Sequence, residues 1–247
     1  MTDHLFKTTV RAGVLQARRR QTEWLSTGFD GGRHVADAVY NITVPEGWNE
    51  TGLREYVDRR LERAGFEPSA PALLTGVDQR HARCAVCDPV SVIVTAGVSN
   101  PTTVPPVAGG GLATENETDA EGPNRGDGKG FQPGTINILA VTNHSLPAGA
   151  LANLVSVVTE AKTATLLRLT GFSGTTSDAV IVGTDPSGQP AKFSGSATAV
   201  GRAARACVRD ALTASLASRY RDEPIPESVK AAAYGCETTD RSVLRSL

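Results

Sequence analysis

Polar side chains interrupt otherwise apolar stretches at four places. Their types are those that could bind an amide group or take part in its hydrolysis. The clusters are Ser26 to Gly32 with Asn41, Thr95 to Asn100, Thr135 with Asn137, and Glu160 and Lys162 with Ser177 and Asp178. Taken singly, a Thr at a strand start commonly caps a turn, and an Asn in a strand can be a satisfied core amide. Together they supply hydroxyls, amides, a carboxylate and a lysine, which suits a polar substrate with amide groups.

Most of these clusters fall at predicted strand ends, in glycine-rich turns or at the first residues of strands. In open sheets flanked by helices, ligands bind where strand ends and helix starts meet. We therefore expect one pocket at one edge of a sheet. The residues expected to contact substrate there are Ser99, Asn100, Asn137, Asn41, Ser177 and Thr176, and those expected to carry the chemistry are Asp178, Glu160, Lys162 and Thr135.

Hydrolysis of an amide needs a nucleophile, a base that activates it, and donors for the developing oxyanion. In one scheme, Asp178 or Glu160 activates a water molecule. Asn137, Lys162 or the backbone amides after Gly97 then hold the oxyanion.

In a second scheme, the hydroxyl of Ser99 or Thr135 attacks directly, and Lys162 or a carboxylate takes its proton. The Gly134–Thr135 pair also permits self-cleavage that frees a threonine amine. The same pair is equally typical of a turn that leads into a strand, so the nucleophile is left open between water and a hydroxyl.

The four cysteines include one CxxC pair, Cys84 and Cys87, whereas Cys207 and Cys236 stand apart. A structural zinc site usually needs two tight ligand pairs, although His81 lies nearby. The pair falls in a predicted strand, where residues 84 and 87 point to opposite faces. This pattern favours buried small residues over a zinc site or a redox pair, and the histidines are scattered, so no metal is predicted.

The bulk composition excludes several classes of partner. The chain has 247 residues, of which 40% are hydrophobic and 21% charged, with a formal net charge of −1. This balance argues against a nucleic acid or a membrane surface as partner. No apolar run approaches the length of about 18 residues that a membrane span requires. The start of the chain lacks the pattern of a secretory signal, so we expect a cytoplasmic protein.

Hydrophobic periodicity predicts three helices, at residues 49–65, 145–171 and 194–220. Asn49 and Ser145 are the candidate N-caps of the first two helices, and Gly65 and Gly171 are expected to end them. Strands are predicted in the ranges 24–32, 34–45, 70–77, 83–98, 135–141 and 178–184.

This element order favours a single α+β domain with a mixed sheet covered by helices, and the alternative is a three-layer α/β fold. We expect the domain to span residues 1–223. It would carry a flexible insert at about 105–130, where prolines, glycines and acidic residues follow one another. Residues 224–247 are expected to form a loose C-terminal tail.

Five segments, taken in order, resemble the adenosylcobinamide amidohydrolase family. They are "WLSTGFDGG…AVYNITV", "VTAGVSNP", "PGTINILAV", "SLPAGALANLVSVVTEAKTATLL" and "SGTTSDAVIVGT". The resemblance covers roughly residues 20–210 without the insert. Its most specific part is "GTINI", followed at helix distance by "TEAKTA" and then by "TTSDAV". Ser177 departs mildly from the threonine-rich stretch that usually precedes the last Asp in this family.

The resemblance implies an enzyme that hydrolyses the amide joining aminopropanol to the corrin ring of adenosylcobinamide. The product, adenosylcobyric acid, would re-enter cobamide (coenzyme B12) synthesis. The corrinoid is then the substrate, so no cofactor is expected, and the partner is a small corrinoid molecule. The oligomeric state is left open. The alternatives are a non-catalytic corrinoid-binding module and an amidase that acts on another amide.

Overall fold

The computed structural model describes residues 4–45, 47–67, 70–105, 135–240 and 242–245. The predicted insert at about 105–130 therefore lies, apart from Pro105, outside the described residues.

The main sheet has eight strands and is mixed, as predicted. Its strand order is β4-β3-β2-β11-β8-β6-β5, and β1 pairs with β2 beside this path. Strands β11 and β8 are parallel, as are β3 and β4, whereas the other neighbours are antiparallel. The bounds are β1 (Lys7–Arg11), β2 (Val14–Ser26), β3 (Gly32–Thr43), β4 (Ala72–Thr75), β5 (Arg83–Cys87), β6 (Val90–Ala96), β8 (Ile136–Thr142) and β11 (Ala179–Thr184).

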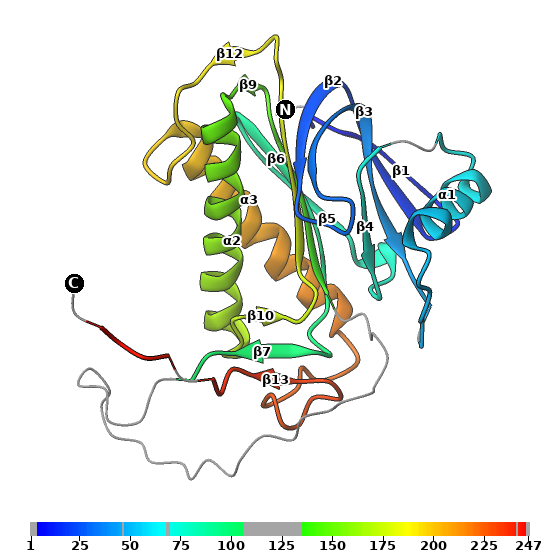
Figure 1. The fold of residues 1–247 in the computed structure, drawn as a ribbon, viewed down its shortest axis with the longest axis vertical. Coiled ribbons are helices and arrows are strands. Elements are labelled where there is room, and N and C mark those ends of the chain that lie inside the picture. The colour runs from blue at the N-terminus through cyan, green and yellow to red at the C-terminus, as the bar shows by residue number, and fades with distance from the viewer. Residues whose placement is uncertain (1–3, 46, 68–69, 106–134, 241, 246–247) are drawn as a thin grey trace.

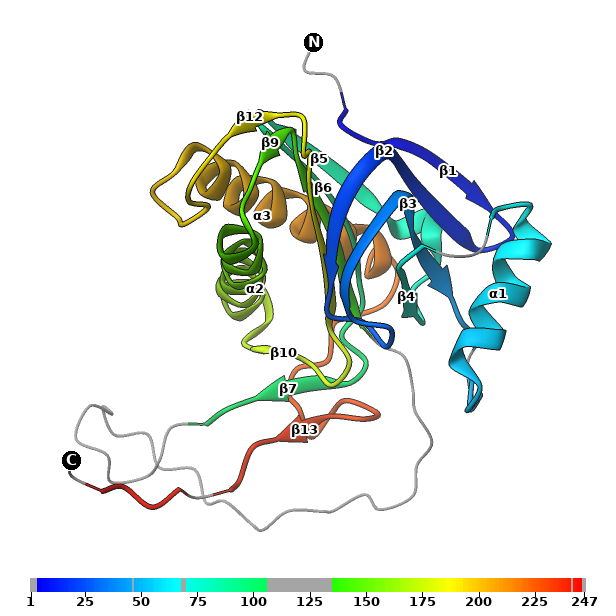
Figure 2. The same ribbon diagram turned by 45° about the horizontal axis from the view of Figure 1, so that its top comes forward.

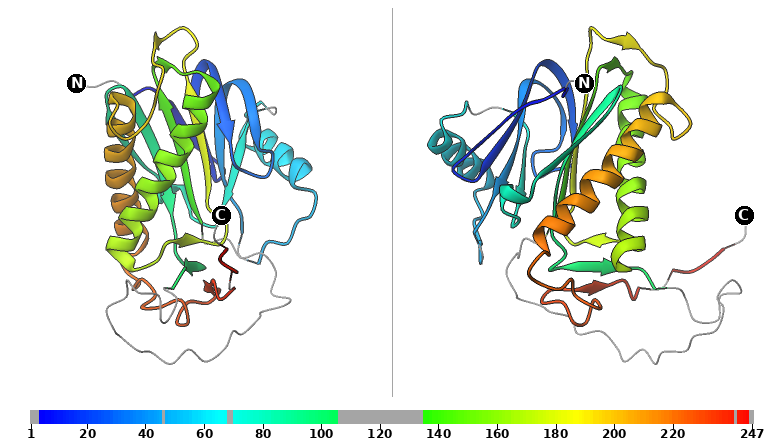
Figure 3. Two further views of the ribbon diagram at one scale, coloured as in Figure 1. Left: turned by 60° about the vertical axis from the view of Figure 1, so that its left-hand side comes forward. Right: turned by 180° about the vertical axis from the view of Figure 1, so that it is seen from behind.

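Two long helices cover one face of the sheet over β6, β8 and β11 (Figures 1 and 3). The helices are α1 (Leu53–Ala64), α2 (Ala148–Thr170) and α3 (Ala199–Arg219). Alternate residues of β8, such as Ile138, face α2 and α3 and share a core with Leu154 and Val208. This alternation follows from the two-residue period of a strand. The result is the predicted single α+β domain with a helix-covered mixed sheet.

The other face of these strands is covered by the N-terminal part of the same sheet. Trp24 of β2, Val39 of β3 and Leu73 of β4 pack with Leu139 of β8 and Ile181 of β11 in a second core. Helix α1 lies outside this curled part, on the side opposite α2 (Figure 1). Buried side chains therefore line both faces of β8 and β11, which accounts for their mostly apolar sequences.

The predicted helix ends are confirmed, and the predicted starts are wrong. Gly65 and Gly171 follow α1 and α2 in the left-handed conformation, with φ of 69° and 77°. Asn49 does not cap α1, which has Gly52 at its N-cap position and begins only at Leu53. Ser145 lies in a short strand, so α2 also begins later than predicted, whereas α3 begins at Ala199 after a Thr198 cap.

Part of the C-terminal tail pairs with the rest of the fold. Strand β13 (Cys236–Glu237) pairs with β7 (Pro101–Thr103), which pairs on its other side with β10 (Gly174–Thr175). Figure 2 shows this small sheet across one end of the main sheet. A further pair joins β9 (His144–Ser145) to β12 (Gln189–Pro190). Among the described helices, none is long and apolar enough to cross a membrane.

Candidate active site

Three predicted clusters meet at one end of the main sheet, where β8 and β11 begin and β6 ends. Asn137 of β8 lies opposite Ala179 of β11 on one side and Thr95 of β6 on the other. Asn100 follows β6 and approaches the residues just before β11, because its side chain donates to Thr176. The expected convergence at one sheet edge is therefore found for these segments.

Asp178 and Lys162 form a buried ion pair at this edge. The Lys162 side chain reaches from α2, and the exposed fractions of the two side chains are 8% for Lys162 and 12% for Asp178. Lys162 donates to Oδ2 of Asp178, and this oxygen also accepts from the backbone N–H of Thr175 at 3.1 Å. Oδ1 accepts from the Thr175 hydroxyl and, at 3.0 Å, from the backbone N–H of Ile136. The carboxylate therefore ties α2 to the starts of β8 and β11.

This geometry bears on the predicted role of Asp178 as a base. An ionised carboxylate offers about four acceptor positions, and here each oxygen already receives two donors. The arrangement suits the positioning of Lys162, and Asp178 can take a proton only after one of its donors leaves.

A chain of hydroxyl groups adjoins the ion pair. The Asn100 amide donates to the Thr176 hydroxyl at 2.6 Å and to the Ser177 hydroxyl at 3.5 Å. Ser177 donates in turn to the Thr135 hydroxyl at 3.1 Å, and Thr135 donates to the Ser177 carbonyl at 2.8 Å. Thr135 is fully buried, whereas Ser177 is half-buried and Thr176 is exposed.

The bonds of Thr135 limit its predicted role as a nucleophile. Its proton goes to a carbonyl oxygen, which is not a base that could activate the hydroxyl. Gly134 lies outside the described residues, so self-cleavage before Thr135 stays a prediction.

Asn41 and Asn137 occupy the opposite face of the sheet, between its two curled parts. The Asn137 amide donates to Asn41 Oδ1 at 2.8 Å and to the Leu74 carbonyl at 2.9 Å. The Asn41 amide donates to the Thr95 hydroxyl at 2.9 Å and to Gln79 Oε1 at 3.4 Å. Both asparagines are almost completely buried, and in the described part of the chain Asn137 Oδ1 has no hydrogen-bond partner. The two amides therefore link the layers of the sheet beside the ion pair.

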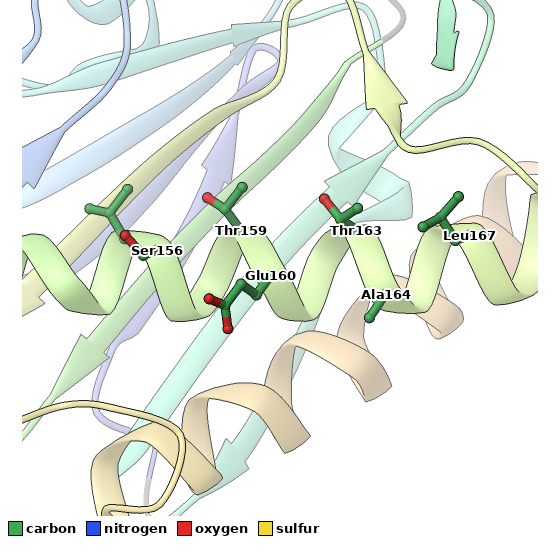
Figure 4. Close-up of a pocket in the computed structure, with 7 residues that line it drawn as sticks. Ser156, Thr159, Glu160, Thr163, Ala164 and Leu167 are labelled. Carbon is green, nitrogen blue, oxygen red and sulfur yellow. The ribbon is translucent and has the colours of Figure 1, made fainter. Parts of the chain in front are cut away.

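Glu160 does not join the cluster. It is exposed on α2 and pairs with Arg205 of α3 at 3.5 Å. Figure 4 shows it projecting from α2 on the side opposite Thr159 and Thr163. Residues two apart on a helix point about 200° apart, so Glu160 faces outward because Lys162 faces inward. It lines an open surface cavity of about 580 Å³ on α2, away from the ion pair.

Ser99 is exposed, and its carbonyl accepts from the backbone N–H of Tyr234 at 3.3 Å. The C-terminal segment thus lies against the loop that carries Ser99 and Asn100, which no sequence pattern indicated. Thr175 was also missed as a site residue. The sequence signal for Thr175 was the threonine-rich stretch before Asp178, because a hydroxyl three residues before a carboxylate can donate a hydrogen bond to that carboxylate.

The cysteines form no metal site with neighbouring ligands. Over the described ranges, no three His, Cys, Asp or Glu residues are grouped so that they could hold a metal ion. Cys84 and Cys87 are exposed, so the prediction that they are buried is wrong, because β5 is an edge strand that pairs only with β6. Cys207 lies on the buried face of α3, where burial raises the pKa of its thiol to about 12.

Comparison with known proteins identifies the family. The model of a family described as adenosylcobinamide amidohydrolase matches residues 2–224. A Halobacterium salinarum protein named adenosylcobinamide amidohydrolase is 50% identical over 236 residues, covering 95% of this chain and 96% of the relative. A Methanosarcina mazei protein of the same name is 31% identical over 161 residues, covering 65% of this chain and 68% of the relative.

Similarity to solved structures is more distant. A crystal structure of a Pyrococcus horikoshii protein aligns with a TM-score of 0.41 and 12% identity, covering 85% of this chain and 78% of that one. The ordered motifs, which span roughly residues 20–210 without the insert, fall within the range that the family model and the relatives match. This chain belongs to the adenosylcobinamide amidohydrolase family of hydrolases.

Proposed function

We propose that this enzyme hydrolyses the amide bond that links aminopropanol to the corrin ring of adenosylcobinamide. Water adds to the amide carbon, the C–N bond breaks, and adenosylcobyric acid and aminopropanol leave, the acid becoming available for cobamide synthesis. The corrinoid is the substrate in this proposal, and no resident cofactor takes part. The supporting observation is the buried Lys162–Asp178 pair at the sheet edge, beside a chain of hydroxyls and amides.

Lys162 is the group best placed to stabilise the oxyanion of the tetrahedral intermediate. Its ammonium group is almost fully buried, and a fixed charge in a water-poor site stabilises developing charge more strongly than in water. An ammonium group has three N–H donors, so the bond to Asp178 leaves two N–H groups for a substrate oxygen. Asp178 holds the lysine side chain in place at the end of the sheet.

The same pair can link oxyanion binding to proton transfer. When Lys162 turns toward the oxyanion, the Oδ2 atom of Asp178 loses one of its two donors. That acceptor position then becomes free to take the proton of the attacking water. Water is favoured over Thr135 as nucleophile, because the Thr135 hydroxyl is buried and donates to a carbonyl. The half-buried Ser177 and the Asn100 amide would orient the substrate at the mouth of the site.

The test is to incubate the purified enzyme with adenosylcobinamide and to follow adenosylcobyric acid and aminopropanol by chromatography and mass spectrometry. In the Lys162→Met variant we expect kcat/KM to fall about 10²- to 10³-fold, the range seen when a single oxyanion donor is removed. Methionine keeps most of the side-chain volume, so the helix packing can be retained. Lys192→Met is the matched control, since Lys192 is exposed and follows β12, which lies at the opposite end of the main sheet from β10 (Figure 1).

The outcomes separate the alternatives. Binding of adenosylcobinamide without product would favour a non-catalytic corrinoid-binding module. Hydrolysis of other amides in preference to the corrinoid would favour a different amidase. Full activity in a folded Lys162→Met variant would remove Lys162 from the mechanism.

A further inference from the structure

A second polar cavity lies where α3 ends, next to the 3₁₀ turn η1 (Gln79–His81). Its volume is about 380 Å³, and it is lined by Arg80, His81, Arg83, Ser218, Arg221 and Asp222. Three guanidinium groups thus face one carboxylate. The proposed hydrolysis gives no role to any of these residues.

Hydrogen bonding at Ser218 leaves its O–H donor without an acceptor among the residues that the structure describes. Arg80 Nε donates to His81 Nε2 at 3.1 Å, so the proton of the neutral imidazole lies on Nδ1 and is donated to the Ser218 hydroxyl at 3.0 Å. Arg83 donates to the same hydroxyl oxygen. A hydroxyl accepts through two lone pairs, and both are used here. The Ser218 O–H therefore remains as a donor, and among the described residues it has no acceptor.

The charges around the cavity also favour binding of an anion. No carboxylate in the described part of the chain lies within ion-pair distance of Arg80, Arg83 or Arg221. Burial first, and then the charges of Arg80 and Arg219, lower the pKa of His81, while the Asp78 carboxylate acts in the opposite direction. The opposing charges are the Asp222 carboxylate in the lining and the partial charge of about −0.5 at the end of α3, which the three guanidinium groups together exceed.

One guanidinium group is fixed before any ligand arrives. Arg83 donates to the carbonyls of Arg80 and Ala82 at 2.9 Å and 2.8 Å, as well as to Ser218. Arg80 and Arg221 are exposed at the rim, and Arg80 is held through its Nε by His81. Donors that are fixed before the ligand arrives reduce the ordering cost of binding an anion.

We propose that this cavity binds a phosphate-type oxyanion, either free or carried by a small molecule. Arginine matches phosphate because its planar fork forms two parallel charge-assisted hydrogen bonds. A donor-rich lining suits an anion with several acceptor oxygens better than a halide. The volume also exceeds what one small ion fills, and it lies in the range of small-molecule pockets.

The anion site connects to the end of the sheet that carries the candidate active site. Ser215 of α3 donates to the His81 carbonyl at 2.9 Å and accepts from the backbone N–H of Ala96 at 3.0 Å. Ala96 is the last residue of β6, four residues before Asn100. A bound anion would thus be held by η1 and α3, which support the loop leading to the active site.

The experiment is isothermal titration calorimetry of the full chain with inorganic phosphate and, separately, with adenosine monophosphate as a phosphate monoester. Ionic strength is held constant with chloride. We expect saturable binding to the wild type and at least 10-fold weaker binding to the Arg80→Gln/Arg221→Gln double variant, since two of three cations are lost. Arg209→Gln is the control, because Arg209 is exposed on the same helix and pairs with Asp210.

The two ligands distinguish the sources of the anion. Tighter binding of the monoester assigns the site to a phosphorylated small molecule, and equal or tighter binding of inorganic phosphate assigns it to the free ion. The proposal is overturned if neither ligand binds beyond the effect of chloride. It is also overturned if the double variant, shown to be folded by circular dichroism, binds like the wild type, or if Arg209→Gln loses binding equally.

Discussion

At the scale of single residues, the candidate site depends on how the donors around one carboxylate are arranged. Asp178 receives two of its four donors from backbone N–H groups, those of Thr175 and Ile136. Backbone donors cannot be inferred from the types of side chain in the sequence. The sequence could therefore indicate Asp178 and Lys162 as site residues, but not that the Asp178 carboxylate already accepts four hydrogen bonds. Asp178 is therefore placed to hold Lys162, and in the proposed mechanism it takes a proton only after Lys162 has turned away.

Gly174 leaves the space that this ion pair occupies. A Cβ atom added there would lie 2.9 Å from Asp178 Oδ2 and 3.3 Å from Lys162 Nζ. The Gly174→Ala substitution should therefore push the two charged groups apart or shift the strand. We expect kcat/KM for adenosylcobinamide to fall about 10²-fold, which is the cost of a misplacement of about 1 Å at a catalytic group. Steady-state kinetics measures this directly.

Gly149→Ala serves as the control for this substitution, since nothing lies within 4 Å of a Cβ atom at that position in the first turn of α2. Its activity should match the wild type. Wild-type kinetics in Gly174→Ala would show that the position of the ion pair is unimportant for turnover.

At the scale of elements, hydrophobic periodicity and glycine positions predicted most helices and strands. The helix starts and the strand pairing of the tail were not predicted. Alternating or continuous apolar runs identified β6, β8 and β11, and glycines identified two helix ends, because these signals are local. Asn49 and Ser145 were wrong as caps, because the N-cap positions are taken by Gly52 and Pro147, and neither helix start has a side-chain capping bond. β13 has two residues and pairs with β7 over 130 residues earlier in the chain, so no local pattern could reveal it.

The pairing of the tail gives a prediction about substrate binding that rests on the proposed function. The backbone N–H of Thr238 donates to the Thr103 carbonyl at 3.0 Å, just beyond β13. Proline at position 238 removes this donor, and a hydrogen bond of this kind contributes about 0.5–1.5 kcal/mol. Because the tail lies against the loop carrying Ser99, we expect KM in Thr238→Pro to rise about 3- to 10-fold with kcat little changed.

Thr239→Pro is the matched control, because the Thr239 N–H has no acceptor within the described part of the chain. Comparing KM values for the two proline variants isolates the hydrogen bond from the stiffness of proline. Identical KM values in both variants and the wild type would remove the tail from the substrate site.

At the scale of the whole molecule, the fold class followed from the element order, but the curl of the sheet did not. β2 pairs with β11 and β3 with β4, pairings that join distant or parallel segments and depend on side-chain packing across the complete fold. This curl explains why the predicted cluster divides. Asn41 and Asn137 lie within β3 and β8 and face the second core, whereas Asn100 and Thr135 lie just outside the strands and contact the residues before Asp178.

The interlayer amides should therefore contribute to stability more than to substrate binding. Asn137→Ala leaves Asn41 Oδ1 and the Leu74 carbonyl without a donor in a buried place, and each such loss costs about 1–3 kcal/mol. We expect urea denaturation to show a loss of about 2–4 kcal/mol, with KM near the wild-type value in the folded fraction. Asn49→Ala, exposed and capping no helix, should change stability by less than about 0.5 kcal/mol. A raised KM with unchanged stability in Asn137→Ala would instead place this amide in contact with the corrinoid, because the lost hydrogen bonds would then affect substrate binding and not folding.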